Sequence, residues 1–161
     1  MAQSVTNSYV NENSTSVANN TSNVTVYAIF TKTSGEYASD NPQWKIYVNG
    51  SVVASGTKNF TAGTKGNIDL GSWTGDIAHN ADGTGSMTWC VSFEGNKHPT
   101  AESNWFTTGT LTKSLTKINR GLMRVKDGST WKTGLVYVKD GSTWKLGQAY
   151  VKDGNNWKLG I

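Results

Sequence analysis

The sequence predicts an all-β protein, made of an antiparallel immunoglobulin-like β-sandwich followed by a small module of three tandem β-hairpin repeats. Three observations support this prediction. Apolar residues alternate with polar ones over many short segments. Turn-forming Asn-Gly and Asp-Gly dipeptides separate these segments. Three near-identical 13-residue units follow one another at the C-terminal end.

The alternation is clearest in residues 23–33, where Val24, Val26, Ala28 and Phe30 share one face of a predicted strand. Residues 44–55 contain two short apolar runs around Asn49-Gly50, which predicts a tight β-hairpin. Residues 85–95 alternate again, with a second apolar face that comprises Met87, Trp89, Val91 and Phe93.

Seven to nine such strands, evenly spaced and without a convincing helix, predict an immunoglobulin-like sandwich. Large aromatic residues dominate the cores of small sandwiches. We therefore expect the core to contain Phe30, Trp44, Trp89, Phe93 and Trp105. The alternative is that one or two of these rings form a stacking platform for sugars.

Charge divides the chain near residue 118. Residues 1–118 carry seven lysines against eight acidic residues, whereas residues 119–161 have a net charge of +5. This predicts a sandwich domain over 1–118 and a basic repeat module over 119–161.

The repeats span 124–136, 137–149 and 150–161, and each contains a Val-Lys-Asp-Gly-x-x-Trp-Lys sequence. Each unit predicts a minimal β-hairpin with Asp-Gly as its turn. Because an isolated hairpin is marginally stable in water, the units are expected to stack on each other, on the sandwich or on other chains.

Two interpretations of the repeat residues are open. The tryptophans form a shared core, within one chain or between subunits, which we favour because few other large apolar residues are present. Alternatively, they form a row of equivalent ligand sites that bind a repetitive target with avidity. In both cases the candidate binding or oligomerisation residues are Trp131, Trp144, Trp157, Lys132, Lys145, Lys158, Tyr137 and Tyr150.

No catalytic residue, metal site or cofactor is predicted. The sequence contains no nucleophile-elbow, P-loop, H-E-x-x-H or C-x-x-C motif. The Asp76–Asp82 segment resembles a Ca²⁺ loop in composition but lacks its spacing, so a turn that includes Asp82-Gly83, with His79 as a structural hydrogen-bonding residue, is preferred. Cys90 is expected to be small and largely buried.

The regular lysines of the repeats raise the question of nucleic-acid binding, which combines stacking with phosphate contacts. Every repeat also contains an Asp, so we favour a role in solubility and in blocking edge pairing. The N-terminus has no signal-peptide pattern, no segment is long and apolar enough to insert in a membrane, and the single cysteine excludes an internal disulfide.

Residues 14–120 resemble a family of immunoglobulin-like domains of unassigned function from tail-associated structural proteins of long-tailed bacteriophages. The matching motifs are SVANNTSNVTV, WKIYVNGSVV, DIAHNADGTG and TLTKSLTKINR. Asn119 stands where the family often has Pro. The C-terminal units also resemble V-x-V-x-x-G-x-W-K repeats of phage tail and fibre proteins.

The resemblance implies a virion protein. The missing signal-peptide pattern predicts synthesis in the host cytoplasm, and the missing catalytic motifs favour a function by binding without catalysis. The expected partners are other virion proteins and copies of the same chain, with a trimer as one form. A host cell-surface glycan is a further expected partner, whereas nucleic acid is not. The alternative function is a carbohydrate-binding module of a cell-wall-active system.

Overall fold

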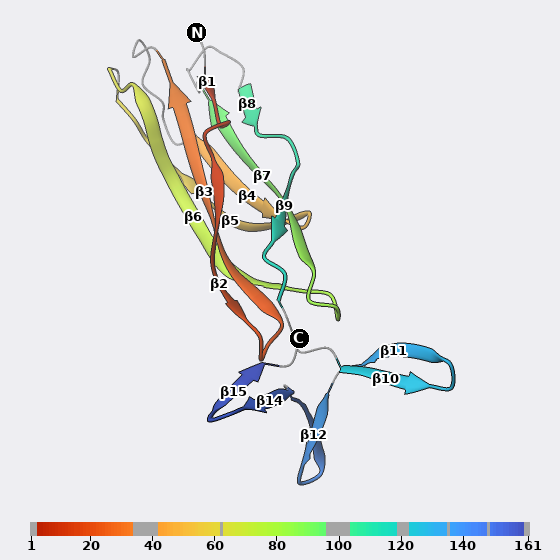
Figure 1. Cartoon of the computed structure of the whole chain (residues 1–161). Coiled ribbons are helices and arrows are strands. Elements are labelled where there is room, and N and C mark those ends of the chain that lie inside the picture. Colours follow the sequence, from red (N-terminus) through yellow and green to blue (C-terminus); the bar gives the residue numbers. More distant parts are fainter. Residues whose placement is uncertain are drawn as a thin grey trace.

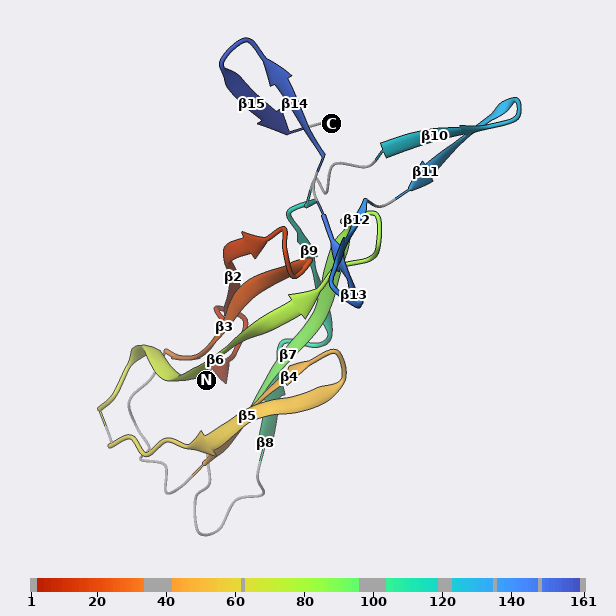
Figure 2. The same ribbon diagram turned by 90° about the horizontal axis from the view of Figure 1, so that it is seen from below.

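The computed structural model of the chain describes residues 3–33, 42–61, 63–95, 104–118, 123–134, 136–147 and 149–159. Within these ranges the regular structure consists of β-strands in antiparallel sheets. Figures 1 and 2 show two layers of long strands. The three small hairpins follow β9 (Leu111–Leu115) and project from that end of the sandwich. The predicted all-β architecture, a sandwich with hairpin units, is confirmed.

The first sheet is built on the long strand β3 (Thr21–Lys32). Strand β6 (Gly66–Ala78) pairs along one edge of β3 over its whole length. The other edge pairs first with β2 (Tyr9–Ser16) and then with the short β1 (Gln3–Ser4).

The second sheet has the order β5-β4-β7, and the free edge of β7 is shared by β8 and β9. The strands are β4 (Gln43–Val48), β5 (Ser51–Thr57), β7 (Gly85–Gly95), β8 (Asn104–Thr107) and β9 (Leu111–Leu115). Strands β4 and β5 form the predicted hairpin, in which Asn49 and Gly50 have φ values of 48° and 80°. Positive φ at both positions is the reason that Asn-Gly suits this turn.

The core lies between the two sheets and is formed by the alternating residues. Val24, Val26, Ala28 and Phe30 of β3 are 0% exposed, as the period of two predicts. They face the apolar side of β7, and the rings of Phe30 and Phe93 lie 4.3 Å apart. Four of the five expected core aromatics are buried: Phe30, Trp44, Trp89 and Phe93.

Trp105 is the exception, and its assignment to the core was wrong. It is 48% exposed and lies opposite Glu94 on the outer face of β8, where Lys45 lies 5.6 Å from its ring centre. The neighbouring Phe106 lies opposite Phe93 and packs against the core instead. Adjacent residues of a strand point to opposite faces, so only one ring of this Trp-Phe pair enters the core.

The remaining strands form three separate hairpins in which each pairs with its own neighbour. They are β10 (Met123–Asp127) with β11 (Thr130–Gly134), β12 (Tyr137–Asp140) with β13 (Thr143–Leu146), and β14 (Tyr150–Asp153) with β15 (Asn156–Leu159). The Asp is the last paired residue of each first strand, so the turn is Gly-Ser or Gly-Asn and not the predicted Asp-Gly. The turn glycines have φ values of 60–62°, as expected at the first central position of a type II′ turn.

The turn after β6 fixes the end of the sandwich that leads into the hairpins. The Gly83 carbonyl accepts hydrogen bonds from the Ile118 amide (2.9 Å) and from Nδ1 of His79 (2.8 Å). Ile118 is buried. This turn therefore anchors the last described residue before the hairpins.

Candidate functional site: the aromatic faces of the hairpins

The register of the hairpins places a lysine directly opposite each repeat tryptophan. The pairs are Lys126 with Trp131, Lys139 with Trp144, and Lys152 with Trp157. Directly paired residues of antiparallel strands lie on the same face of the sheet. Each hairpin therefore carries a Trp and a Lys side by side on one face, which we call the aromatic face.

In the second and third hairpins a tyrosine lies on the aromatic face two residues before the lysine. Tyr137 and Tyr150 are both more than half exposed. The ammonium groups of Lys139 and Lys152 lie 5.9 and 6.0 Å from the centres of the Trp144 and Trp157 rings. This distance is within the range of a cation–π interaction.

The opposite face of the hairpins carries the aspartates. Lys132 and Asp127 form an ion pair at 2.6 Å, and Lys145 and Asp140 form the equivalent pair at 2.5 Å. The side chain of Lys158, which completes the predicted set, lies outside the described part of the structure. In the first two hairpins, the lysines predicted as candidates, Lys132 and Lys145, are thus paired with an aspartate. The lysines of the aromatic face, Lys126, Lys139 and Lys152, were missed in the sequence analysis.

The repeat tryptophans are the most exposed large apolar side chains among the described residues. Trp131, Trp144 and Trp157 are 60%, 63% and 65% exposed. The favoured interpretation, a shared core, is therefore wrong for a single chain. A core formed between chains and a row of ligand sites both remain compatible with this exposure.

His79 has the structural role that the sequence predicts. Its Nε2 lies 2.7 Å from Ser22 Oγ, and its Nδ1 carries a proton because a carbonyl oxygen only accepts. Ser22 is fully buried and donates to Glu12 at 2.6 Å. This Ser, His and carboxylate combination is a buried structural network, since the hydroxyl has no access to a substrate.

Glu12 joins this network to Thr116, directly after β9, in the segment that leads to the hairpins. Its carboxylate accepts hydrogen bonds from the amide and the hydroxyl of Thr116, each at 2.9 Å. Burial alone would raise the pKa of Glu12. The hydrogen bonds from Ser22 and Thr116, together with nearby His79, outweigh burial and hold the pKa below its usual value.

The Asp76–Asp82 segment runs from the end of β6 into a turn that side-chain hydrogen bonds stabilise. Asp82 Oδ1 accepts hydrogen bonds from the amide and the hydroxyl of Thr84, and these bonds lower the pKa of Asp82. Asp76 is bound instead by the amide group of Asn23, at 2.7 Å. Across the described residues, no group of three or more His, Cys, Asp or Glu side chains is arranged to hold a metal ion.

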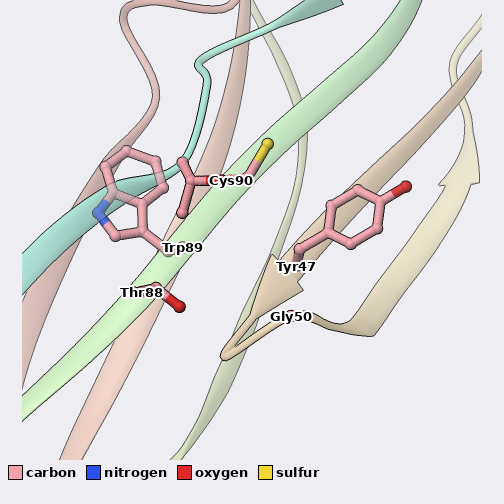
Figure 3. A pocket seen from close by; sticks show the side chains of 6 residues that line it. Tyr47, Gly50, Thr88, Trp89 and Cys90 are labelled. Atoms are coloured by element: carbon pink, nitrogen blue, oxygen red, sulfur yellow. The ribbon is translucent and has the colours of Figure 1, made fainter.

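A second candidate, an open hollow of about 340 Å³, lies beside the turn between β4 and β5. It is lined by Tyr47, Gly50, Thr88, Trp89, Cys90 and Thr110. Figure 3 shows the ring of Trp89 on one side of β7 and the ring of Tyr47, on β4, on the other. The lining includes no charged group that would orient a ligand, so this hollow is a weaker candidate than the hairpins.

Cys90 is half-buried, and the expectation that it is largely buried was wrong. It pairs with Tyr47 across β4 and β7, and its thiol lies 3.1 Å from the Thr107 hydroxyl. The burial prediction failed because Cys90 follows Trp89, which occupies the inward position. Separately, the described part of the chain contains no helix that is long and apolar enough to cross a membrane.

Comparison with known families gives a match that covers most of the chain. Residues 6–133 match the family described as siphovirus protein of unknown function (DUF859), which covers the sandwich and most of the first repeat. No curated protein and no solved structure matches the chain, so the immunoglobulin-like classification of the sandwich stays a prediction. The matched region includes most of the chain, and the predicted origin in long-tailed bacteriophages agrees with it. The chain therefore belongs to this family of siphovirus proteins.

Proposed function

We propose that the chain is a structural or accessory protein of the phage particle that acts by oligomerisation and by adhesion to the particle or to the host cell surface. Residues 1–118 form the supporting domain, and residues 119–161 form the contact module. Its partners are other virion proteins and further copies of the chain, a trimer being one form. Neither catalysis, a cofactor nor nucleic-acid binding is part of this proposal.

The observation that carries the proposal is the exposure of Trp131, Trp144 and Trp157 on three consecutive hairpins. Covering the exposed parts of three such rings would contribute roughly 7–11 kcal/mol as an upper estimate. Isolated two-stranded hairpins are marginally stable in water. A partner surface that covers these rings would therefore stabilise both the contact and the hairpins.

Two measurements test this proposal. Peptide mass spectrometry of purified phage particles is expected to detect the chain. Sedimentation is expected to show an oligomer of the isolated protein, or co-sedimentation of the protein with added particles. Substituting the three hairpin tryptophans with Ala is expected to abolish the association while the sandwich keeps its unfolding transition. A protein that is absent from particles and binds neither particles nor host cells would contradict the proposal.

The second candidate is a carbohydrate-binding module of a cell-wall-active system. The observation that favours it is the position of Lys139 and Lys152 beside exposed indole rings, since sugars stack on such rings. This function predicts binding to purified cell-wall glycan by a monomer that is absent from the particle. Particle association of the same protein would reject it.

A further inference from the structure

The three hairpins differ in the residue that precedes the lysine on the aromatic face. The second and third hairpins have Tyr137 and Tyr150 at this position, whereas the first has Arg124. The family match ends at residue 133, so the two tyrosine-bearing hairpins lie beyond the region that matches the family. The second and third hairpins therefore differ from the first both in this residue and in lying outside the family match.

In the second hairpin, the lysine that no described carboxylate neutralises lies on the aromatic face. On the other face of the second hairpin, Lys145 is neutralised by Asp140. Lys139 and Lys152 form no ion pair with any described side chain and lie against indole rings. Among the described side chains of these two hairpins, an anionic ligand would thus meet unneutralised cations beside the exposed Trp and Tyr rings.

We propose that hairpins β12–β13 and β14–β15 are two equivalent binding sites for a glycan polymer that bears phosphate or carboxylate groups. This inference rests on the proposed adhesion function and names the class of ligand. An indole ring packs against the apolar face of a sugar, the adjacent ammonium group binds the anion, and the tyrosine hydroxyl donates a hydrogen bond. Two sites that are 13 residues apart suit a polymer with repeating units, because simultaneous engagement raises the apparent affinity.

The test measures binding of the full chain to four immobilised polymers. Alginate is a carboxylate glycan, phosphomannan is a phosphate glycan, dextran is a neutral glycan, and poly-L-glutamate is an anionic polymer without sugar. We expect binding to alginate or phosphomannan, which distinguishes the two anionic groups. Binding to dextran and to poly-L-glutamate is expected to be at least about tenfold weaker, because each lacks one of the two recognised features.

Variants assign the binding to the aromatic faces. Lys139→Gln with Lys152→Gln keeps both indole rings and is expected to weaken binding about five- to tenfold, with a smaller dependence on salt. Lys145→Gln removes a lysine from the other face of the same hairpin and is expected to change binding less than about twofold. Trp105→Ala removes an exposed Trp that also has a lysine beside it, but on the sandwich, and is expected to leave binding unchanged.

Three results would overturn the inference. Equal binding to dextran, unaffected by Lys139→Gln with Lys152→Gln, would show neutral-sugar recognition and leave adhesion as a function intact. Equal binding to poly-L-glutamate would show charge attraction alone. Absence of binding to every polymer, with oligomers that dissociate on Trp144→Ala and Trp157→Ala substitution, would assign these faces to assembly. A chain that neither oligomerises nor binds particles or cells would instead contradict the proposed function itself.

Discussion

Substitution of Gly83 tests whether the turn after β6 anchors the segment that leads to the hairpins. Gly83 is buried, has a φ of 79°, and its carbonyl accepts hydrogen bonds from His79 and Ile118. A Cβ atom at this position would lie 1.9 Å from the Ile118 carbonyl oxygen, which is backbone and cannot rotate away. The Gly83→Ala substitution must therefore move the turn or the backbone at Ile118.

The expected cost has three parts. A left-handed φ at a residue with a Cβ costs about 1–2 kcal/mol. Overpacking against the backbone costs about 1–3 kcal/mol. Loss of one hydrogen bond to the displaced carbonyl costs about 1 kcal/mol. Because the same movement relieves the clash and weakens the bond, we expect a total loss of about 3–5 kcal/mol in the free energy of unfolding.

Gly50→Ala is the matched control. Gly50 has a φ of 80°, but a Cβ there would meet no atom within 4 Å. Its substitution is expected to cost only the backbone term, about 1–2 kcal/mol. Urea unfolding followed by near-ultraviolet circular dichroism measures both variants. Equal destabilisation of the two would refute the claim that Gly83 packs against Ile118.

Three further predictions concern other parts of the fold. Trp44→Ala is expected to lower the free energy of unfolding by about 3–5 kcal/mol because this ring is buried, whereas Trp105→Ala is expected to lower it by less than about 1 kcal/mol. Thermal unfolding compares the two variants, and similar losses would contradict the assigned faces. Glu12→Gln is expected to cost about 1.5–3 kcal/mol at pH 7. Because the pKa of Glu12 is lowered by folding, the difference from wild type should shrink as pH falls below about 4.5, and a pH-independent difference in urea unfolding would contradict the network. Gly141→Ala strains the turn of the second hairpin and should remove amide protection from residues 137–146 while the sandwich amides keep theirs. Hydrogen exchange measures this protection, and a matching loss in the sandwich would show that the hairpin and the sandwich are coupled.

Much of the sandwich could be predicted from the sequence because its strands have strict period-two alternation. Val24 to Phe30 on β3 and Met87 to Phe93 on β7 lie on the faces that the pattern indicates. The Trp105-Phe106 pair could not be assigned in this way. Either of two adjacent large aromatic residues could point into the core, and the pairing register of β8 with β7 decides which one does.

The repeats were predictable as hairpins but their contacts were not. The 13-residue period and the glycines indicate a turn in each unit, yet a Gly-Ser turn shifts every cross-strand partner by two residues from the partner that an Asp-Gly turn would give. That shift places Lys139 opposite Trp144, where an Asp-Gly turn would place Tyr137. The sequence also does not show whether an apolar ring is covered by its own chain, since a core residue and a binding residue have the same apolar chemistry.

Hydroxyl-radical footprinting with peptide mass spectrometry tests the central claim most directly. In the free chain, Trp131, Trp144 and Trp157 are expected to be oxidised rapidly, like Trp105, whereas Trp44 is protected. When the protein is bound in the particle or on its target, the three hairpin tryptophans are expected to become protected while Trp105 remains reactive. Hairpin tryptophans that are protected in a free monomer, or that stay fully reactive in the bound state, would contradict the account.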